Sequence, residues 1–301
     1  MSLKSQDDGY LSGFIAIIGP PNVGKSTLLN RLLGTKVAIV SPKPQTTRNR
    51  IQGILHGEGY QMIFMDTPGI HKTKTLLHKS MVSSATAAMS EVDIIVVMID
   101  MLGPQDPNIP LILHDLKNTN KPIFLVINKI DMGPKETLLP IMNEYGIKLP
   151  FEDVIPISAL KGDGVEILLK ALKSKLKEGP PFFPLDMNTD QSEAFLISET
   201  IREKIYSHTR KELPYSSAVT VGGMEEIKEK NLLTINATVH VESDSQKAIL
   251  IGRQGRMIKA IGQSARFELE GIFGIHIFLD LRVKVEKNWS KDPRALRRLG
   301  Y

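Results

Sequence analysis

The chain has no cysteine and only one tryptophan among its 301 residues. Without a thiol it can form no disulfide bond and no thiolate metal site, and it has no cysteine nucleophile. No apolar run approaches the roughly 18 residues that a transmembrane helix needs, so we expect none. The first eight residues also lack the apolar stretch of a signal peptide. The length and the apolar content of 42% instead indicate a globular protein with two domains.

Charge is distributed unevenly along the chain. Residues 1–180 contain 20 Lys or Arg and 17 Asp or Glu, and residues 181–246 contain 6 and 11. Residues 247–301 contain 12 and 5, so the last part of the chain is concentrated in positive charge. Such a region is typical either of a solvated charged face or of a site for a polyanion.

The most informative motif is Gly19–Ser26, which reads G-x-x-x-x-G-K-S. It follows the apolar run Phe14–Ile18 and precedes the helical pattern Thr27–Leu33, which is the strand–loop–helix context that a phosphate-binding P-loop requires. The free N–H groups and the dipole of the helix N-terminus favour phosphate there. We expect Lys25 to reach the β- and γ-phosphates and the Ser26 hydroxyl to bind Mg²⁺.

Apolar runs alternate with helical patterns up to about residue 177. The runs are Phe14–Ile18, Met62–Met65, Ile94–Ile99, Ile123–Ile127 and Val154–Ile157, and helical patterns lie near 75–90, 107–118, 135–145 and 164–177. Continuous apolar strands are buried on both faces, as in a parallel sheet flanked by helices. We predict a doubly wound α/β domain, in which ligands bind at the carboxyl ends of the strands.

Two segments beside the P-loop are candidates for Mg²⁺ and the γ-phosphate. Asp66 follows the run Met62–Met65, and we expect it to hold Mg²⁺ through water while the N–H of Gly69 meets the γ-phosphate. The segment 41–50 has two prolines and no apolar periodicity, which indicates a loop. A threonine in it can bind Mg²⁺ when GTP is present. We favour Thr47, with Thr46 as the alternative.

Two further strand ends have the residues that guanine recognition needs. The carboxylate of Asp131 can accept from N1–H and the 2-amino group of guanine, which adenine does not offer. We expect Asn128 to tie this loop to the P-loop and to reach N7, and Lys129 to lay its stem along the base. The Ala159 N–H of the segment 158–160 is expected to donate to guanine O6.

Together these motifs resemble the translation-factor-like GTPases in order and spacing. The resemblance implies GTP and GDP as ligands, Mg²⁺ at Ser26, Thr47 and Asp66, and catalytic roles for Lys25, Thr47 and Gly69. The implied nucleotide-binding residues are Gly19, Asn22, Val23, Gly24, Lys25, Ser26, Thr27, Asp66, Gly69, Asn128, Lys129, Asp131, Ser158, Ala159 and Leu160.

Two positions qualify this resemblance. Ile70 stands where many small GTPases have a water-orienting glutamine, which implies slow hydrolysis without help. His71 could be a substitute base, although we favour an exposed loop histidine. Asn22 is the residue that potassium-activated members use to help bind K⁺, so K⁺ is left open as a second cation.

The segment 178–184 is rich in glycine and proline and indicates a domain boundary. We predict a GTPase domain over 1–180, a linker over 181–189 and a second domain over 190–301. Its pattern is a helix near 190–209, strands near 217–222 and 231–241, a helix before Gly252–Gly255, a helix after it and a strand over 275–285. This order matches a bacterial-type KH domain, an α+β fold whose G-x-x-G loop clamps single-stranded RNA. The expected RNA-binding residues are Gly252, Arg253, Gln254, Gly255, Arg256 and Lys259.

The basic tail has five cations that we expect to meet phosphates: Lys287, Lys291, Arg294, Arg297 and Arg298. Trp289 can either stack on a base or pack against the domain. A GTPase domain followed by a KH domain and this tail resembles the Era family over essentially the whole chain. The resemblance implies a cytoplasmic GTPase, partly associated with the membrane, that binds the 3′ end of 16S ribosomal RNA (rRNA) during its maturation and during assembly of the 30S subunit. Nothing in the sequence indicates a dimer, so we expect a monomer.

The sequence leaves two other functions open. The chain could bind RNA constitutively, with the GTPase part acting only as a slow timer. It could also regulate a membrane surface through the basic tail, although the tail lacks the long amphipathic helix that surface anchoring favours.

Overall fold

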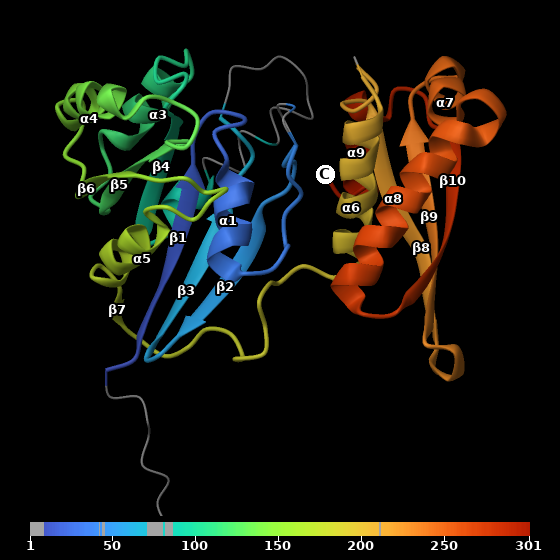
Figure 1. The fold of residues 1–301 in the computed structure, drawn as a ribbon, viewed down its shortest axis with the longest axis horizontal. Helices are drawn as coiled ribbons and strands as arrows, with labels where there is room; N and C mark the ends of the chain where they lie inside the picture. Colours follow the sequence, from blue (N-terminus) through green and yellow to red (C-terminus); the bar gives the residue numbers. More distant parts are fainter. Residues whose placement is uncertain (1–8, 42, 44–45, 71–80, 82–86, 211) are drawn as a thin grey trace, which may run out of the picture. The chain divides into compact units, whose positions relative to one another are not determined.

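The computed structural model describes residues 9–41, 43, 46–70, 81, 87–210 and 212–301. These residues fold into two compact units (Figure 1). Among them, residues 9–38, 47–70 and 81–190 belong to the first unit, and residues 39–46 and 191–301 belong to the second. No helix in the described ranges is both long and apolar enough to cross a membrane.

The first unit is built on a mixed sheet with a parallel core. The sheet follows the order β2-β3-β1-β4-β5-β6, and β7 pairs with the start of β1. All neighbours from β3 to β6 are parallel, while β2 and β7 are antiparallel to their partners. The strands are β1 (Leu11–Ile18), β2 (Ile51–Gly57), β3 (Tyr60–Asp66), β4 (Ile94–Asp100), β5 (Ile123–Asn128), β6 (Asp153–Pro156) and β7 (Lys177–Glu178).

Helices cover this sheet and complete its core. Those that the structure describes in full are α1 (Lys25–Leu33), α3 (Ile109–Leu116), α4 (Leu138–Gly146) and α5 (Val165–Lys173). Every residue of β5 is buried, which agrees with strands that are covered on both faces. The helices expected near 107–118, 135–145 and 164–177 are confirmed, whereas the pattern near 75–90 lies mostly outside the described residues.

The predicted doubly wound α/β fold is confirmed, and its sheet has an antiparallel edge strand that the sequence did not predict. The strand β2 (Ile51–Gly57) was not predicted, because its sequence interrupts the apolar residues with Gln52, Gly53 and His56. It lies at the edge of the sheet and runs antiparallel to β3, and four of its seven residues are only partly buried. An edge strand needs no continuous apolar run.

The segment 181–189, which we expected to be a linker, is fastened to the first unit. The buried side chain of Gln61 accepts from the N–H groups of Phe182 and Phe183 and donates to the Phe183 carbonyl. The N–H of Ile54 donates to the carbonyl of Asn188 at 2.9 Å. Hydrogen bonds to β2 and β3 therefore hold both parts of this segment.

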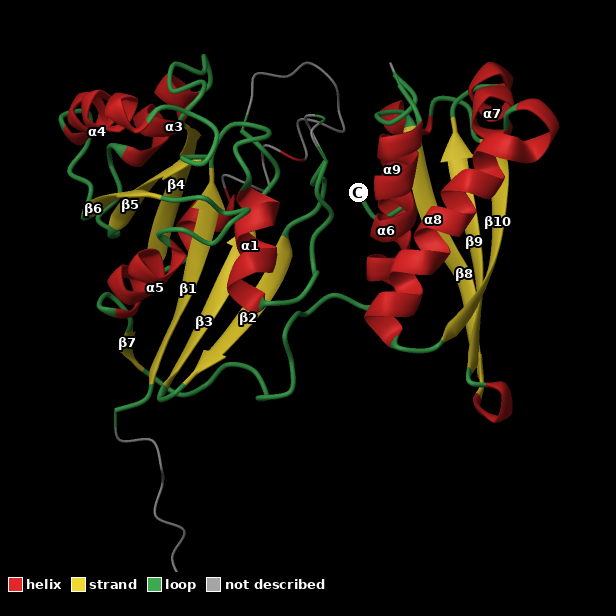
Figure 2. Ribbon diagram, in the orientation of Figure 1, coloured by secondary structure: helices red, strands yellow, loops and turns green. Residues whose placement is uncertain are grey.

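The second unit has three strands with helices packed on them (Figure 2). The central strand β9 pairs in parallel with β10 and antiparallel with β8. The predicted order of helix, two strands, two helices around the G-x-x-G loop and a last strand is confirmed. The elements are α6 (Glu193–His208), β8 (Ser217–Ile227), β9 (Leu232–Val241), α7 (Asp244–Ile251), α8 (Arg256–Phe273), β10 (His276–Val285) and the unpredicted α9 (Pro293–Arg298).

The tryptophan of the tail is part of this fold. Trp289 is fully buried, its Nε1–H donates to the Ser216 carbonyl at 3.2 Å, and its ring stacks on Tyr301 with 5.8 Å between centroids. The structure therefore supports packing and contradicts the alternative that this ring stacks on a base.

We expect Trp289→Ala to lower the free energy of unfolding of the second unit by about 3–5 kcal/mol, because a large buried ring is replaced by a cavity. Urea denaturation followed by circular dichroism measures this change. Arg294→Ala in the same tail is the control and should change stability by less than about 0.5 kcal/mol, since its side chain is exposed. A loss below about 1 kcal/mol in Trp289→Ala would contradict the packing role.

Candidate functional site

The P-loop joins the carboxyl end of β1 to α1. Gly24 has φ 99°, and a Cβ there would lie 2.3 Å from Nδ2 of Asn128, so the position requires glycine. Lys25 is buried, and its Nζ donates to the carbonyls of Gly19 at 3.1 Å and Pro20 at 2.8 Å. Two of its three donors are thus used by the loop, and one is left for an anion. Burial lowers the pKa of Lys25 to about 8.

Three oxygen-bearing side chains meet where Mg²⁺ was expected. The Ser26 Oγ donates to Oδ2 of Asp66 at 2.6 Å and lies 2.8 Å from Oγ1 of Thr47. Asp66 is fully buried, and within the described residues its Oδ1 has no hydrogen-bond partner. Burial raises the pKa of Asp66 to about 6, against the opposing effect of Lys25 and the two hydroxyls. An orphaned carboxylate oxygen beside two hydroxyls is a donor set that suits Mg²⁺.

The two threonines of the loop have different partners. Thr47 lies beside Ser26 and Asp66, whereas Oγ1 of Thr46 donates to the Lys43 carbonyl at 2.7 Å. The backbone carbonyl of Thr46 accepts from the guanidinium of Arg202 on α6. Only Thr47 is therefore in position to complete the oxygen cluster.

The segment after Asp66 returns to the P-loop. A Cβ at Gly69 would lie 2.7 Å from the backbone nitrogen of Pro21, so the two loops are in close contact. The N–H of Ile70 donates to the Gly19 carbonyl at 3.2 Å, and its side chain is 1% exposed within the core. This side chain is directed into the protein and can hold no water. His71 lies outside the described residues.

The loops expected to bind the base are tied together by Asn128. Its Nδ2 donates to the Val23 carbonyl at 2.7 Å, and its Oδ1 accepts from the N–H of Ala159 at 2.9 Å. The link to the P-loop agrees with our prediction. The Ala159 N–H, which we expected to donate to guanine O6, instead has an acceptor within the protein, and both ends of the Asn128 amide are used.

The remaining predicted residues line the same edge of the sheet. Lys129 has a positive φ of 68°, and its Nζ forms an ion pair with Oδ2 of Asp100 at 2.5 Å. Asp131 is partly exposed, and Asn22 is exposed in the P-loop with φ 64°. Thr27 follows Ser26 on α1, and Ser158 is buried at the start of the third loop.

Sequence reasoning missed two residues of this edge. Asp100 orients Lys129 and also accepts from the N–H of Leu102 at 2.9 Å. It follows an apolar strand directly, which is the signal that could have identified it. Arg31 on α1 donates to the carbonyls of Ala159 and Leu160. Nothing in the sequence pattern relates Arg31 to residues about 130 positions later.

The second unit contains the predicted G-x-x-G loop between α7 and α8. Gly252, Gln254 and Gly255 all have positive φ, and the side chains of Arg253 and Gln254 are exposed. Arg256, Lys259, Gln263 and Arg266 follow at helical spacing along α8, and all four are exposed. This spacing places them on one face of the helix, which gives a basic stripe that begins at the loop.

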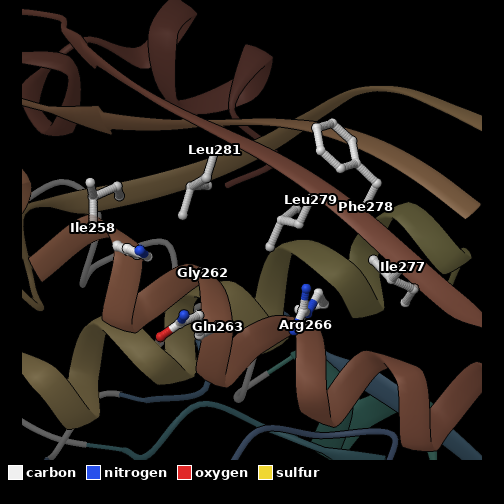
Figure 3. A pocket seen from close by; sticks show the side chains of 9 residues that line it. Ile258, Gly262, Gln263, Arg266, Ile277, Phe278, Leu279 and Leu281 are labelled. Carbon is white, nitrogen blue, oxygen red and sulfur yellow. The ribbon is translucent and has the colours of Figure 1, made fainter. Parts of the chain in front are cut away.

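A groove of about 330 Å³ lies beside this stripe, between α8 and β10. Figure 3 shows Leu279 and Leu281 pointing from the strand toward the helix. Gly262 lies on the helix side, and a Cβ there would meet no atom within 4 Å, so the wall is open at that position. The groove is lined by Ile258, Lys259, Gly262, Gln263, Arg266, Ile277, Phe278, Leu279 and Leu281.

We expect Thr47→Ala to lower Mg²⁺-dependent GTP hydrolysis roughly 10- to 100-fold, the range for loss of a group that supports a metal. Thr46→Ala should change it less than about threefold, because the Thr46 side chain bonds only within its own loop. Single-turnover hydrolysis over a Mg²⁺ titration measures both variants. A larger loss in Thr46→Ala than in Thr47→Ala would reverse the assignment.

Two families of known domains match the chain. Residues 14–129 match the family described as 50S ribosome-binding GTPase, and residues 212–290 match the KH domain family. The first match covers the P-loop and Asn128, and the second covers the G-x-x-G loop and the groove.

Full-length relatives and solved structures are also similar to this chain. It is 51% identical over 292 residues to GTPase Era of Syntrophus aciditrophicus, a match that covers 97% of this chain and 95% of the relative. It is 46% identical over 295 residues to GTPase Era of Geobacter metallireducens, covering 98% and 99%.

Two crystal structures of Era each have a TM-score of 0.93 and 43% identity, and each match covers 97% of this chain and 99% of the other. One is a variant from Aquifex aeolicus bound to GDP and AlF4⁻, and the other is a complex with MgGDPNP and nucleotides 1506–1542 of 16S rRNA. With this identity over nearly its full length, the chain belongs to the Era family of GTPases.

Proposed function

We propose that this GTPase binds 16S rRNA near its 3′ end through the groove between α8 and β10, and that it acts in rRNA maturation and assembly of the 30S subunit. The observation that carries the proposal is the groove itself, one wall of which includes Lys259 and Arg266 of the basic stripe that follows the G-x-x-G loop along α8. The related Era structure that contains nucleotides 1506–1542 of 16S rRNA supports the choice of RNA.

The geometry of the nucleotide site supports a role in hydrolysis for several of its groups. Lys25 and the N-terminus of α1 hold the phosphates, and the N–H of Gly69 is close enough to the P-loop to meet the γ-phosphate. Ser26, Thr47 and Asp66 would hold Mg²⁺, which would supply positive charge for phosphoryl transfer. Because Ile70 is buried, no side chain at that position orients water, and the intrinsic rate is slow. Asn22 would help to hold K⁺ if this chain uses it.

The RNA site combines backbone and base contacts. The glycines of the loop allow a phosphate to approach the backbone, and Arg253, Arg256 and Lys259 supply positive charge. The apolar side chains of β10 provide a surface for bases, and Phe278 is 58% exposed there. The exposed cations Lys287, Lys291, Arg294, Arg297 and Arg298 extend the positive charge beyond the groove.

The loop that contains Thr46 and Thr47 supports a GTP-dependent switch. Thr47 belongs to the first unit and lies beside the Mg²⁺ residues, while Thr46 belongs to the second unit and accepts from Arg202. Arg202 is fully buried and paired through two hydrogen bonds with Glu199. A movement of Thr47 when the γ-phosphate leaves would be transmitted across one peptide bond to Thr46. In a constitutive RNA-binding protein, the RNA affinity would not depend on whether GTP or GDP is bound.

The family resemblance also supports a monomer in the cytoplasm, with a peripheral membrane fraction. Such a fraction would use the basic tail on anionic lipid. Cosedimentation with anionic vesicles tests this minor role by comparing the parent chain with a variant in which the exposed cations Lys287, Lys291, Arg294 and Arg297 are replaced by glutamine. Loss of binding in the variant supports the role, and equal binding contradicts it.

We expect Gly262→Leu to weaken binding of a short single strand copied from the 3′ end of 16S rRNA by about tenfold or more. A side chain there would fill the space that a base needs, and one stacked or buried base contributes about 1–3 kcal/mol. Fluorescence anisotropy with the labelled strand measures the affinity. Gly262→Ala is the matched control and should bind within about twofold of the parent chain, because a methyl group leaves the groove open.

An unchanged affinity in Gly262→Leu would show that RNA does not use this groove. Arg256→Gln then tells whether the basic stripe still contributes. A loss in that variant alone would locate RNA on the charged face only, which also contradicts the groove proposal.

A further inference from the structure

Asn30 ties the chain that follows α1 back onto that helix. Its Oδ1 accepts from the N–H groups of Val37 and Ala38, both at 3.0 Å, and its Nδ2 donates to the carbonyl of Ala38 at 2.7 Å. One amide side chain therefore satisfies three backbone groups of two residues that are only 5% and 1% exposed. Buried backbone groups need such partners, because a group left unpaired costs more free energy than a typical hydrogen bond contributes.

This contact explains why an asparagine stands at position 30. Asn30 lies inside α1, where asparagine is a poorer helix former than alanine. The helix ends at Gly34, which has φ 66°, and the chain then turns back so that Val37 and Ala38 meet the asparagine. Holding these two residues takes a donor and an acceptor in one side chain, which a side-chain amide provides.

The same helix also holds the other end of the loop. The chain leaves the first unit after Ala38 and returns to it at Thr47. There the Oγ of Ser26, in the first turn of α1, lies 2.8 Å from Oγ1 of Thr47. Ser26 and Asn30 are four residues apart and so share one face of the helix. This face of α1 therefore fixes both the point where the loop departs and the point where it returns.

The two attachments differ in how they depend on a ligand. Thr47 is held by the Ser26 hydroxyl and, at 3.5 Å, by the Asp66 carboxylate, and these are the groups assigned to Mg²⁺. Mg²⁺ and the γ-phosphate would therefore change this attachment. Asn30 instead bonds to backbone groups of Val37 and Ala38, and neither residue is assigned to nucleotide or metal. We expect the attachment at Ala38 to be the same in both nucleotide states.

We propose that Asn30 is a positioning residue for GTP hydrolysis, which fixes the start of the loop 39–50 so that Thr47 reaches Mg²⁺ when GTP is bound. The inference rests on the assignment of Thr47 to Mg²⁺. Fixing the backbone of a residue costs conformational entropy, and Asn30 orders Val37 and Ala38 before any nucleotide arrives. Without Asn30 this cost would fall on the binding of GTP. GDP has no γ-phosphate to order the loop, so its affinity would not depend on Asn30.

The test compares a non-hydrolysable GTP analogue with GDP. We expect Asn30→Ala to weaken the analogue by about tenfold in Mg²⁺ and GDP by less than about twofold, because only the analogue requires the ordered loop. Asn30→Asp keeps the acceptor for the two N–H groups and loses the donor, so it should be intermediate. Thr35→Ala is the control, since Thr35 is exposed in the same turn, and it should bind both nucleotides like the parent chain. Isothermal titration calorimetry gives the dissociation constants.

A purely structural role predicts a different pattern. If Asn30 only supports the fold of the first unit, both nucleotides weaken by the same factor and the melting temperature falls with them, which would overturn the proposal. An unchanged affinity for the analogue in Asn30→Ala would overturn it as well. Should Asn30→Ala be unfolded, Asn30→Asp decides. A loss of about threefold or more for the analogue alone then supports the proposal, and an equal loss for both nucleotides or no loss contradicts it.

A double-mutant cycle shows whether Asn30 acts through Thr47. Thr47→Ala alone should weaken the analogue, and adding Asn30→Ala should weaken it by less than about twofold more, because no hydroxyl is left to position. If the two factors multiply, Asn30 acts elsewhere and the proposal fails while the assignment of Thr47 stands. If Thr47→Ala leaves the affinity for the analogue unchanged, the assignment of Thr47 to Mg²⁺ is itself lost, and the inference with it.

Discussion

The two hydrogen bonds of the Asn128 side chain hold the nucleotide site together. Its amide group is 3% exposed, and it joins the Val23 carbonyl in the P-loop to the Ala159 N–H in the loop after β6. Both partners are backbone groups at the carboxyl ends of parallel strands, so the sheet brings them to one edge and Asn128 fixes their spacing. Replacing this amide would leave two buried backbone groups unpaired, which costs more than the loss of a single exposed hydrogen bond.

The phosphate end of the site depends on two buried groups of opposite charge. Asp66 and Lys25 are both buried, and burial raises the pKa of the carboxyl to about 6 and lowers that of the ammonium to about 8. A divalent cation and phosphate oxygens would supply the missing charge partners of these two groups. Binding of these ligands would therefore offset the cost of burying the two charged groups. Thr47 lies beside Asp66, and the carbonyl of the preceding residue, Thr46, accepts a hydrogen bond from Arg202.

The sequence predicted the elements whose pattern is local and left out those that tertiary contacts decide. Continuous apolar runs identified β1 and β3 to β6, and the glycine motifs identified both ligand loops. The edge strand β2 was missed because its residues alternate only weakly, and α9 was missed because a six-residue helix that begins at a proline gives little periodicity. The choice between Thr46 and Thr47 depended on which side chain the loop turns toward Asp66. The partners of Ala159 and Arg31 depended on groups far away in the chain, and no spacing reveals them.

The proposed switch links the nucleotide state of the first unit to the RNA affinity of the second. The most direct measurement is the affinity for a single strand copied from the 3′ end of 16S rRNA, against a scrambled strand, each with a GTP analogue and with GDP. A linked switch should bind the true strand more tightly with the GTP analogue, by about fivefold or more, and RNA must then raise the preference for the GTP analogue over GDP by the same factor. Equal binding of the true strand in both states would contradict the link, and equal binding of both strands would reduce the second unit to a non-specific polyanion site.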